Sequence, residues 1–174
     1  MNKLIRRAQE GDRNAFADLM LMCERDMYRI ARSILQRDAD IADAMQDTIL
    51  ACYEHLSSLR NPAHFKTWLI RILINKCNDI LKAERKTVSM DMLPETGHSD
   101  PALENVEFEM LMDTLDESYR TALVLRYGEG LSVRQISQVL DISESAVKQR
   151  LKRGRDKAKE LFKQNNMVVM EVLV

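Results

Sequence analysis

Apolar residues recur at steps of three and four along the first half of the chain, a spacing that places their side chains on one face of an α-helix. One apolar stripe covers residues 16–34, a second covers 41–56, and a third follows within 66–86. Three amphipathic helices of this length can bury a common core. We therefore predict a helical domain over residues 1–86.

Polar residues suited to capping precede the first two of these helices. Asp12 or Asn14 can cap the first helix, and Asp38 or Asp40 can cap the second. Short side chains with an oxygen atom accept hydrogen bonds from the free N–H groups at a helix start. The caps and the stripes together favour long helices joined by short connections.

The apolar pattern stops at residues 87–101, TVSMDMLPETGHSDP, and then resumes. This segment contains two prolines and one glycine and has no stripe, so we predict a flexible linker. Further helices are expected at about 102–115, 117–127, 133–140 and 144–163, and they define a second domain over 102–165. The predicted fold class is all-α, with two small helical domains joined by the linker.

The last two predicted helices form a closely spaced pair. Ser132 and Gln135 have the spacing of a capping box, and Ser143 is placed to cap the final helix. One side of that helix is apolar, and the opposite side carries Ser145, Lys148, Gln149, Lys152 and Arg153. A short-turn helix pair with a polar, basic second helix is typical of a helix-turn-helix that reads the DNA major groove. The alternative interpretation is a solvated basic face on an ordinary helical hairpin.

Charge is unevenly distributed, although the formal net charge is only -1. Residues 87–117 contain nine acidic side chains and no Lys or Arg, whereas residues 144–163 contain eight basic and three acidic ones. The basic end can therefore meet a polyanion, and the acidic middle repels one.

Several classes of function find no support in the sequence. No apolar run reaches the roughly 20 residues that cross a bilayer, and the N-terminal residues do not resemble a signal peptide. The three histidines have no metal-ligand spacing, and no Gly-rich phosphate loop or activated nucleophile is evident. The three cysteines lie far apart on apolar stripes, which favours buried structural roles. We predict a cytoplasmic protein without enzymatic activity, metal, cofactor or small-molecule substrate.

Three quoted segments resemble extracytoplasmic-function (ECF, group IV) sigma factors of RNA polymerase. LDESYRTALVLRYGEGLSVRQISQVLDISESAVKQRLKRGRDKAKE, at 115–160, resembles their region 4. DIADAMQDTILACYEHL at 40–56 and FKTWLIRILINKCNDILKAERK at 65–86 resemble the polymerase-clamp helix and the promoter-melting helix of region 2. The resemblance covers about residues 1–165 in the family's order. It implies an alternative sigma factor that binds core RNA polymerase and promoter DNA.

The resemblance also implies which residues bind each partner. Asp43, Gln46 and Asp47 match the acidic motif that binds polymerase, at spacings that place them on one exposed helix face. The expected contacts with the -10 promoter element come from Asn61 and His64 in a loop and from Arg71, Asn75 and Asn78 on the following helix. The basic face at residues 145–153 is expected to read the -35 element. A solvated acidic face is the alternative for the first group.

The sequence does not decide the roles of two aromatic residues near the predicted -10 contacts. Trp68 is better explained as a core anchor than as a direct DNA contact. Phe65 fits a core position and a base-stacking position equally well. The loop 59–65 occupies the place where the family captures a flipped base, although this loop varies within the family.

Some positions depart from the family pattern. Tyr53 stands where the family often has Trp, and Ala44 where it often has a larger aliphatic residue. Asp141 replaces the usual Gly of the helix-turn-helix, which is tolerable because Asp adopts the left-handed conformation more readily than most residues. Gly154 either permits close packing or weakens the last helix. The apolar tail 166–174 either folds back on the second domain or forms an exposed strand that pairs with a partner.

The family resemblance further implies an anti-sigma factor, often membrane-anchored, that blocks both domains until stress releases them. A stand-alone helix-turn-helix regulator is the competing class of function. Such a regulator would bind duplex DNA without polymerase, and it needs neither the clamp helix nor the melting helix of residues 40–86. These two segments therefore favour the sigma factor.

Overall fold

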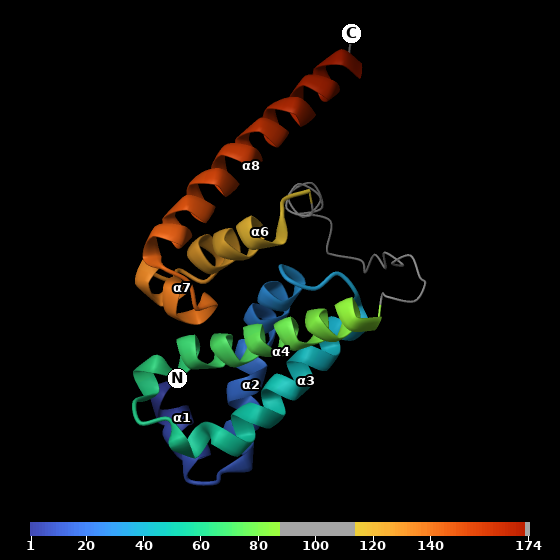
Figure 1. Ribbon diagram of the computed structural model, residues 1–174. Coiled ribbons are helices and arrows are strands. Elements are labelled where there is room, and N and C mark those ends of the chain that lie inside the picture. The colour runs from blue at the N-terminus through green and yellow to red at the C-terminus, as the bar shows by residue number, and fades with distance from the viewer. Residues whose placement is uncertain (88–113, 173–174) are drawn as a thin grey trace. The chain divides into compact units, whose positions relative to one another are not determined.

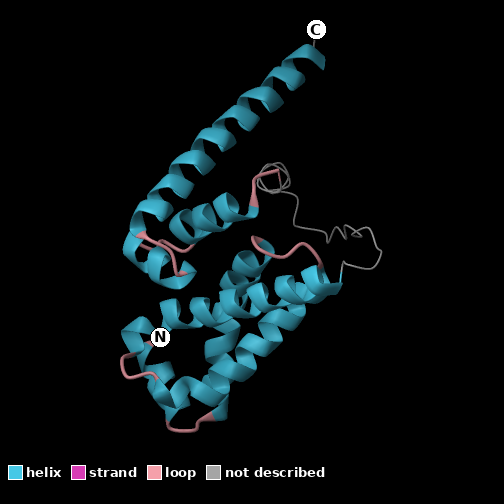
Figure 2. Cartoon of the chain, in the orientation of Figure 1, coloured by secondary structure: helices cyan, strands magenta, loops and turns pink. Residues whose placement is uncertain are grey.

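The computed structural model describes residues 1–87 and 114–172, and all regular structure in these ranges is helical (Figure 2). The chain divides into two compact units, Met1–Gly97 and His98–Val174. Each unit is described by itself below. The helical architecture confirms the predicted all-α fold class.

The first unit contains the four helices α1 (Asn2–Gln9), α2 (Arg13–Arg32), α3 (Asp38–His55) and α4 (Phe65–Thr87). Two short 3-10 turns, Leu56–Ser58 and Pro62–His64, connect α3 to α4. The helices α2, α3 and α4 each contact the other two, and α1 packs on α2 (Figure 1). Helix α1 was absent from the prediction, because its eight residues are too few to show a clear apolar stripe.

The core of this unit forms where the apolar stripes of α2, α3 and α4 meet. Leu19, Ile30, Ile41 and Leu73 are almost fully buried there. The three cysteines are buried as predicted, one on each of these helices. Burial, and to a smaller extent the Cys23 thiol, raises the pKa of Cys52 to about 12. The thiol of Cys52 is therefore protonated at neutral pH, as suits a structural side chain.

The capping predictions have different outcomes for the two helices. The Asp12 carboxylate accepts a hydrogen bond from the Ala15 N–H at 3.0 Å and pairs with Arg7 at 2.6 Å. These contacts hold the pKa of Asp12 below its ordinary value. The prediction that Asp38 or Asp40 caps the second helix is wrong. Arg37 is the N-cap residue of α3 and has no capping side chain, and both aspartates lie in the first helical turn.

The second unit contains α6 (Glu117–Leu123), a π-helical turn (Val124–Gly128), α7 (Val133–Leu140) and α8 (Glu144–Val172). Helix α8 contacts both α6 and α7 (Figure 1). The bounds of α7 are those predicted, whereas the helix predicted for 117–127 changes to π geometry halfway. The predicted helix at 102–115 lies outside the described residues except for its last two positions, and the predicted linker 87–101 does so except for Thr87.

The apolar tail continues α8 as far as Val172 as a single helix (Figure 1). Both interpretations of the tail, a segment folded back on its own domain and an exposed strand, are therefore wrong for residues 167–172. Residues 173–174 lie outside the described part of the chain.

Candidate functional site

The turn between α7 and α8 is fixed by its own side chains and backbone. The Gln135 N–H donates to the Ser132 hydroxyl at 3.2 Å, and the Ser132 N–H donates to the Gln135 side-chain oxygen at 2.9 Å. This pair is the predicted capping box. Asp141 adopts the left-handed conformation with φ 53°, as its replacement of Gly requires. The next N–H, that of Ile142, donates to the Ser137 carbonyl at 3.1 Å and closes the end of α7.

The start of α8 has the predicted cap as well. The Ala146 N–H donates to the Ser143 hydroxyl at 3.2 Å, and the Ser143 and Ser145 hydroxyls lie 2.9 Å apart. Val147 and Leu151 on the inner side of α8 are buried. The five predicted -35 residues, Ser145, Lys148, Gln149, Lys152 and Arg153, are all exposed. The exposed side of α8 thus presents polar and basic side chains.

Gly154 allows α8 to lie close to α6. A Cβ atom at this position would meet Leu123 Cδ1 at 3.1 Å and Tyr119 Cβ at 3.3 Å. The glycine is buried, and so is Leu123. Of the two interpretations offered by the sequence, close packing is the one that the structure supports.

The predicted polymerase-binding residues lie on the outer face of α3. Asp43, Gln46 and Asp47 are exposed, while Ala44 and Thr48 face the core. The Asp47 carboxylate lies 3.6 Å from the ammonium group of Lys76 on α4. This ion pair is exposed and contributes little to stability. The three acidic-motif side chains are therefore accessible to a partner.

Two apolar residues on the same face of α3 were missed by the sequence reasoning. Leu50 is 61% exposed and Tyr53 is 54% exposed. Leu50 follows Gln46 by one helical turn, and Tyr53 follows by a second. The ring of Tyr53 meets the ring of Phe16 edge-on at a centroid distance of 5.1 Å. The signal was available, because both residues fall outside the apolar stripe of their helix.

The loop before α4 is held in place by contacts of its own and by α1. The Asn61 side-chain oxygen accepts a hydrogen bond from the Ala63 N–H at 3.0 Å and so caps the turn Pro62–His64. The Gln9 side chain on α1 donates to the carbonyls of Leu56 and Leu59 at 2.9 and 2.8 Å. Asn61 and His64 are both exposed. Gln9 was not found by the sequence reasoning, since its partners are 47 and 50 residues away.

Helix α4 separates a buried side from an outer side. Phe65 is 1% exposed, which favours the core interpretation of that residue. Trp68 is partly buried and lies 6.1 Å from Phe65 between ring centroids. The predicted -10 residues Arg71 and Asn75 are exposed, and Asn78 is partly exposed. These three residues lie on one side of the helix, because they are spaced by four and three positions.

Two further searches cover the described residues only. No group of three or more His, Cys, Asp or Glu side chains in 1–87 and 114–172 is arranged to hold a metal ion. None of the helices in the same ranges is long and apolar enough to span a bilayer.

A helix-turn-helix whose second helix presents a polar, basic side is typical of DNA-binding proteins. Comparison with protein families makes the class specific. Residues 19–87 match the family model of sigma-70 region 2, and residues 105–157 match that of sigma-70 region 4. Both units therefore match segments of one family of proteins.

Full-length relatives give the family. The ECF RNA polymerase sigma-E factor of Salmonella typhimurium is 30% identical over 174 residues, with 88% of this chain and 89% of the relative aligned. The ECF sigma factor SigW of Bacillus subtilis is 26% identical over 175 residues, with 90% and 93% aligned. The chain belongs to the ECF family of RNA polymerase sigma factors, as the resemblance implied. Its function is that of an alternative sigma factor, which directs core RNA polymerase to specific promoters.

Two solved structures have a similar fold. CnrH, solved in complex with the cytosolic domain of CnrY, has a TM-score of 0.67 and 26% identity, with 94% of this chain and 97% of CnrH aligned. The sigma factor RpoE of Bartonella quintana, solved with the anti-sigma factor NepR, has a TM-score of 0.71 and 20% identity, with 85% and 96% aligned. The RpoE likeness supports the fold alone. Members of this family are initiation factors rather than catalysts.

Proposed function

We propose that the two units divide promoter recognition between them, and that an anti-sigma factor controls both. The first unit binds core RNA polymerase and opens the -10 region, and the second unit reads the -35 element. The chain carries out no chemistry of its own and acts in the cytoplasm. The observation that carries this proposal is the exposed polar surface of α8 directly after a fully capped helix-turn-helix.

The chemistry of α8 supports a major-groove assignment. Lys148, Lys152 and Arg153 can neutralise phosphates or donate to guanine, and Gln149 can pair with an adenine edge. Ser145 lies at the helix N-terminus, where a phosphate is favoured by the free N–H groups. The solvated basic face remains the alternative, and transcription assays separate the two.

The outer face of α3 supports a polymerase-binding role. Its acidic part, Asp43, Gln46 and Asp47, suits a basic partner surface, and its apolar part, Leu50 and Tyr53, adds area that a partner can bury. An apolar centre with a charged margin is the usual anatomy of a protein interface. We assign Leu50 and Tyr53 to the same interface as the acidic motif.

The outer side of α4 supports contacts with the -10 element. Asn75 and Asn78 offer amide groups that can read an exposed base edge, and Arg71 can contact phosphate. Asn61 and His64 complete the surface from the loop. Since the Asn61 side-chain oxygen caps the turn Pro62–His64, its free amide N–H groups are the part that can contact a base.

Solved relatives support control by an inhibitor. RpoE of Bartonella quintana was crystallised with the anti-sigma factor NepR, and CnrH was solved in complex with the cytosolic domain of CnrY. An inhibitor that covers the exposed faces of both units would prevent polymerase binding.

The test adds purified protein to core RNA polymerase on fragmented genomic DNA from the source organism and maps the transcript starts. We expect discrete new starts that share two upstream elements. Direct binding to duplex DNA without polymerase, with no new starts, would instead support a stand-alone regulator. The same assay with Lys148→Ala shows whether the upstream element depends on α8.

A further inference from the structure

The side chain of Gln9 joins the end of α1 to the connection between α3 and α4. Gln9 is the last residue of α1, and its side-chain amide group donates to the Leu56 carbonyl at 2.9 Å and to the Leu59 carbonyl at 2.8 Å. An amide nitrogen carries two hydrogens, so both are used in these bonds. Gln9 precedes the residues 19–87 that match sigma-70 region 2, and the family model therefore does not cover it.

The bond to Leu59 sets the direction in which the chain enters the loop 59–65. Leu56 is buried and anchors the first 3-10 turn, whereas Leu59 is half-buried and Arg60 is exposed. The Leu59 carbonyl belongs to the rigid peptide plane that joins Leu59 to Arg60. A hydrogen bond to this carbonyl therefore fixes a peptide plane that lies one residue before Asn61.

The second half of the loop is held by contacts that do not involve Gln9. The Ala63 N–H and the His64 N–H donate to the side chain and to the carbonyl of Asn61, each at 3.0 Å. The Thr67 hydroxyl donates to the His64 carbonyl at 3.0 Å. Asn61 and His64 thus belong to one small hydrogen-bonded group, whose orientation depends on how its two ends are anchored.

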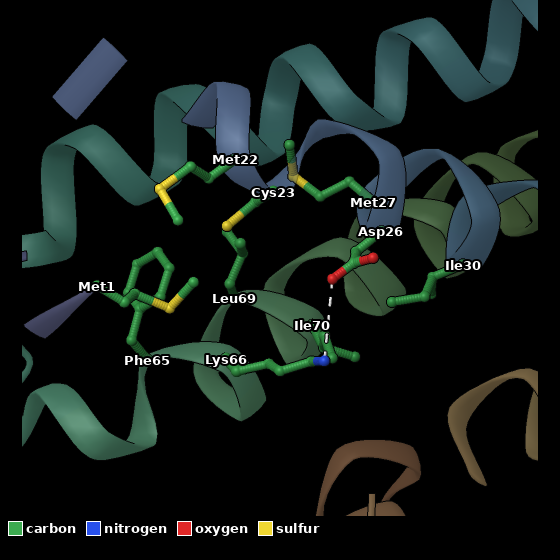
Figure 3. A pocket seen from close by; sticks show the side chains of 10 residues that line it. All are labelled: Met1, Met22, Cys23, Asp26, Met27, Ile30, Phe65, Lys66, Leu69 and Ile70. Atoms are coloured by element: carbon green, nitrogen blue, oxygen red, sulfur yellow. Dashed lines mark ion pairs between the residues drawn. The ribbon is translucent and has the colours of Figure 1, made fainter. Parts of the chain in front are cut away.

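The core anchors the end of this group at Phe65. This residue is 1% exposed, and it lines a small apolar pocket between α2 and α4 (Figure 3). Leu69 lines the same pocket from α4, and Met22 and Cys23 line it from α2. The loop therefore runs from the hydrogen bonds with Gln9 at its start to an apolar anchor at its end.

Gln9 is itself placed by a well-fixed segment. Ile5 is completely buried and holds α1 on the first unit, and α1 contacts both 3-10 turns. After Gln9 the chain turns through Gly11, whose φ of 93° favours glycine. The Asp12 carboxylate closes this turn by pairing with Arg7 at 2.6 Å. A side chain at the end of such a segment can fix the loop without a large motion of its own.

We propose that Gln9 is a positioning residue for promoter recognition: its two hydrogen bonds fix the orientation in which Asn61 and His64 meet a base of the -10 element. The inference rests on the proposed contacts of this loop with the -10 element. Gln9 acts through the loop and does not touch DNA. A loop that is already ordered loses less conformational freedom when it binds, so more of the contact energy appears as affinity. Without Gln9 the loop should hold the base more weakly while the fold stays intact.

The test combines substitutions in the protein with the removal of single bases from the DNA. Gln9→Met keeps a side chain of similar length and removes both donors. Gln36→Met makes the same change at an exposed residue between α2 and α3 and serves as the matched control. The full chain with core RNA polymerase transcribes from a promoter identified by mapped transcript starts, in which each nontemplate base of the -10 element is replaced in turn by an abasic site. The base whose removal no longer matters in Asn61→Ala is the one that the loop holds.

Removal of that base should lower transcription by the wild type and by Gln36→Met about 5- to 150-fold, the usual effect of losing one base contact. With Gln9→Met the loss should be smaller by a factor of about three or more, because part of the contact is already absent. Removal of the other -10 bases should cost the same in all variants. Gln9→Lys should regain most of the sensitivity of the wild type, since an ammonium group can donate to both carbonyls. A residue that only stabilises the unit would instead lower transcription equally from every template.

The remaining outcomes overturn the inference. An unchanged loss at the loop base with Gln9→Met, or an equal change at every -10 base, shows that Gln9 does not position the loop. A denaturant titration followed by Trp68 fluorescence shows whether Gln9→Met is folded. An unfolded variant is replaced by Gln9→Asn, whose amide is too short to reach both carbonyls, and the same outcomes apply. If no base behaves differently in the wild type and Asn61→Ala, the proposed loop contacts themselves fail before any Gln9 variant is compared.

Discussion

The surfaces on α3 and α8 are held in place by different means. The turn into α8 is set by local features within a few residues: the Ser132 capping box, the left-handed Asp141 and the Ser143 cap. The face of α3 is set by long-range packing of its inner side against α2 and α4. The proposed promoter surface of the second unit thus depends on caps, whereas the proposed polymerase surface of the first depends on an intact core.

The largest expected effect comes from the core of the first unit. Phe65→Ala should lower the free energy of unfolding by about 3–5 kcal/mol, because it leaves a cavity at a residue that is 1% exposed. The only tryptophan, Trp68, lies near Phe65 and reports unfolding of this unit by its fluorescence in a denaturant titration. The control Leu50→Ala should change stability by less than about 0.5 kcal/mol, since Leu50 is exposed. Equal effects would contradict the core assignment.

The second prediction separates the two surfaces by function. Lys148→Ala and Arg153→Ala should each weaken promoter recognition by about 1–3 kcal/mol, which corresponds to roughly 5- to 150-fold in transcription at limiting protein. One of these two side chains should contact a base and the other a phosphate, and the sequence does not decide which does which. Both variants should bind core polymerase as the wild type does, whereas Asp47→Ala should lose affinity for polymerase. Unchanged transcription from both α8 variants would refute the assigned DNA face.

The third prediction concerns whether a substitution in α8 raises or lowers the stability of the second unit. Helix propensity alone predicts that Gly154→Ala stabilises the helix by up to about 1 kcal/mol. The contacts at 3.1 and 3.3 Å with Leu123 and Tyr119 should reverse that sign, with a net loss of about 1–3 kcal/mol. Hydrogen exchange of α7 and α8 measures the change, and Asp156→Ala at an exposed neighbouring position serves as control. Stabilisation by Gly154→Ala would show that α6 moves aside at little cost.

The fourth prediction tests whether the side-chain cap at Ser132 stabilises α7. Ser132→Ala removes the hydroxyl that accepts from the Gln135 N–H but keeps the backbone N–H that donates to the Gln135 side chain, and it should cost about 0.5–2 kcal/mol in the second unit only. Ser132→Asp keeps an oxygen acceptor at the cap and should retain most of the stability. Hydrogen exchange in α7 compares the two variants. A similar loss in both would mean that the side-chain cap is not what holds α7.

The smallest expected effect concerns acid sensitivity of the first unit. The Ala15 N–H and Arg7 lower the pKa of Asp12 in the folded chain, so its carboxylate stabilises the fold above the unfolded pKa near 3.8. That contribution is lost as the pH falls below 3.8 through the folded value. Asp12→Asn keeps a cap but removes the charge, so its stability should fall less steeply with acid in this range. An unchanged slope of stability against pH would show that Asp12 is not the responsible group.

Helix caps and helix bounds, which depend on neighbouring residues, were predicted from the sequence more successfully than the packing of distant residues. The capping box at Ser132, the cap at Ser143 and the bounds of α7 were predicted correctly because each depends on neighbours within four residues. The caps proposed for α3 were wrong, because the N-cap is Arg37, one residue before Asp38, and both aspartates lie inside the first turn. The residues assigned to polymerase and DNA stay predictions.

Features made by residues far apart in the chain were missed. Gln9 bonds to carbonyls about 50 residues away, and the pocket between α2 and α4 joins Met22 to Leu69. An apolar stripe identifies which side chains face the core, but it does not show where their packing leaves a pocket. The role of Gly154 was likewise undecided until Leu123 and Tyr119 were seen beside it.

The two opposite sides of α4 have an evolutionary consequence. Substitutions near Arg71 and Asn75 alter the outer side, and substitutions near Leu69 and Ile70 alter the inner side, with little overlap on a helix of this pitch. After gene duplication, the exposed positions of the outer side can therefore vary without disturbing the buried side chains that hold the first unit together. The surface of α4 can thus diverge while its packing is conserved.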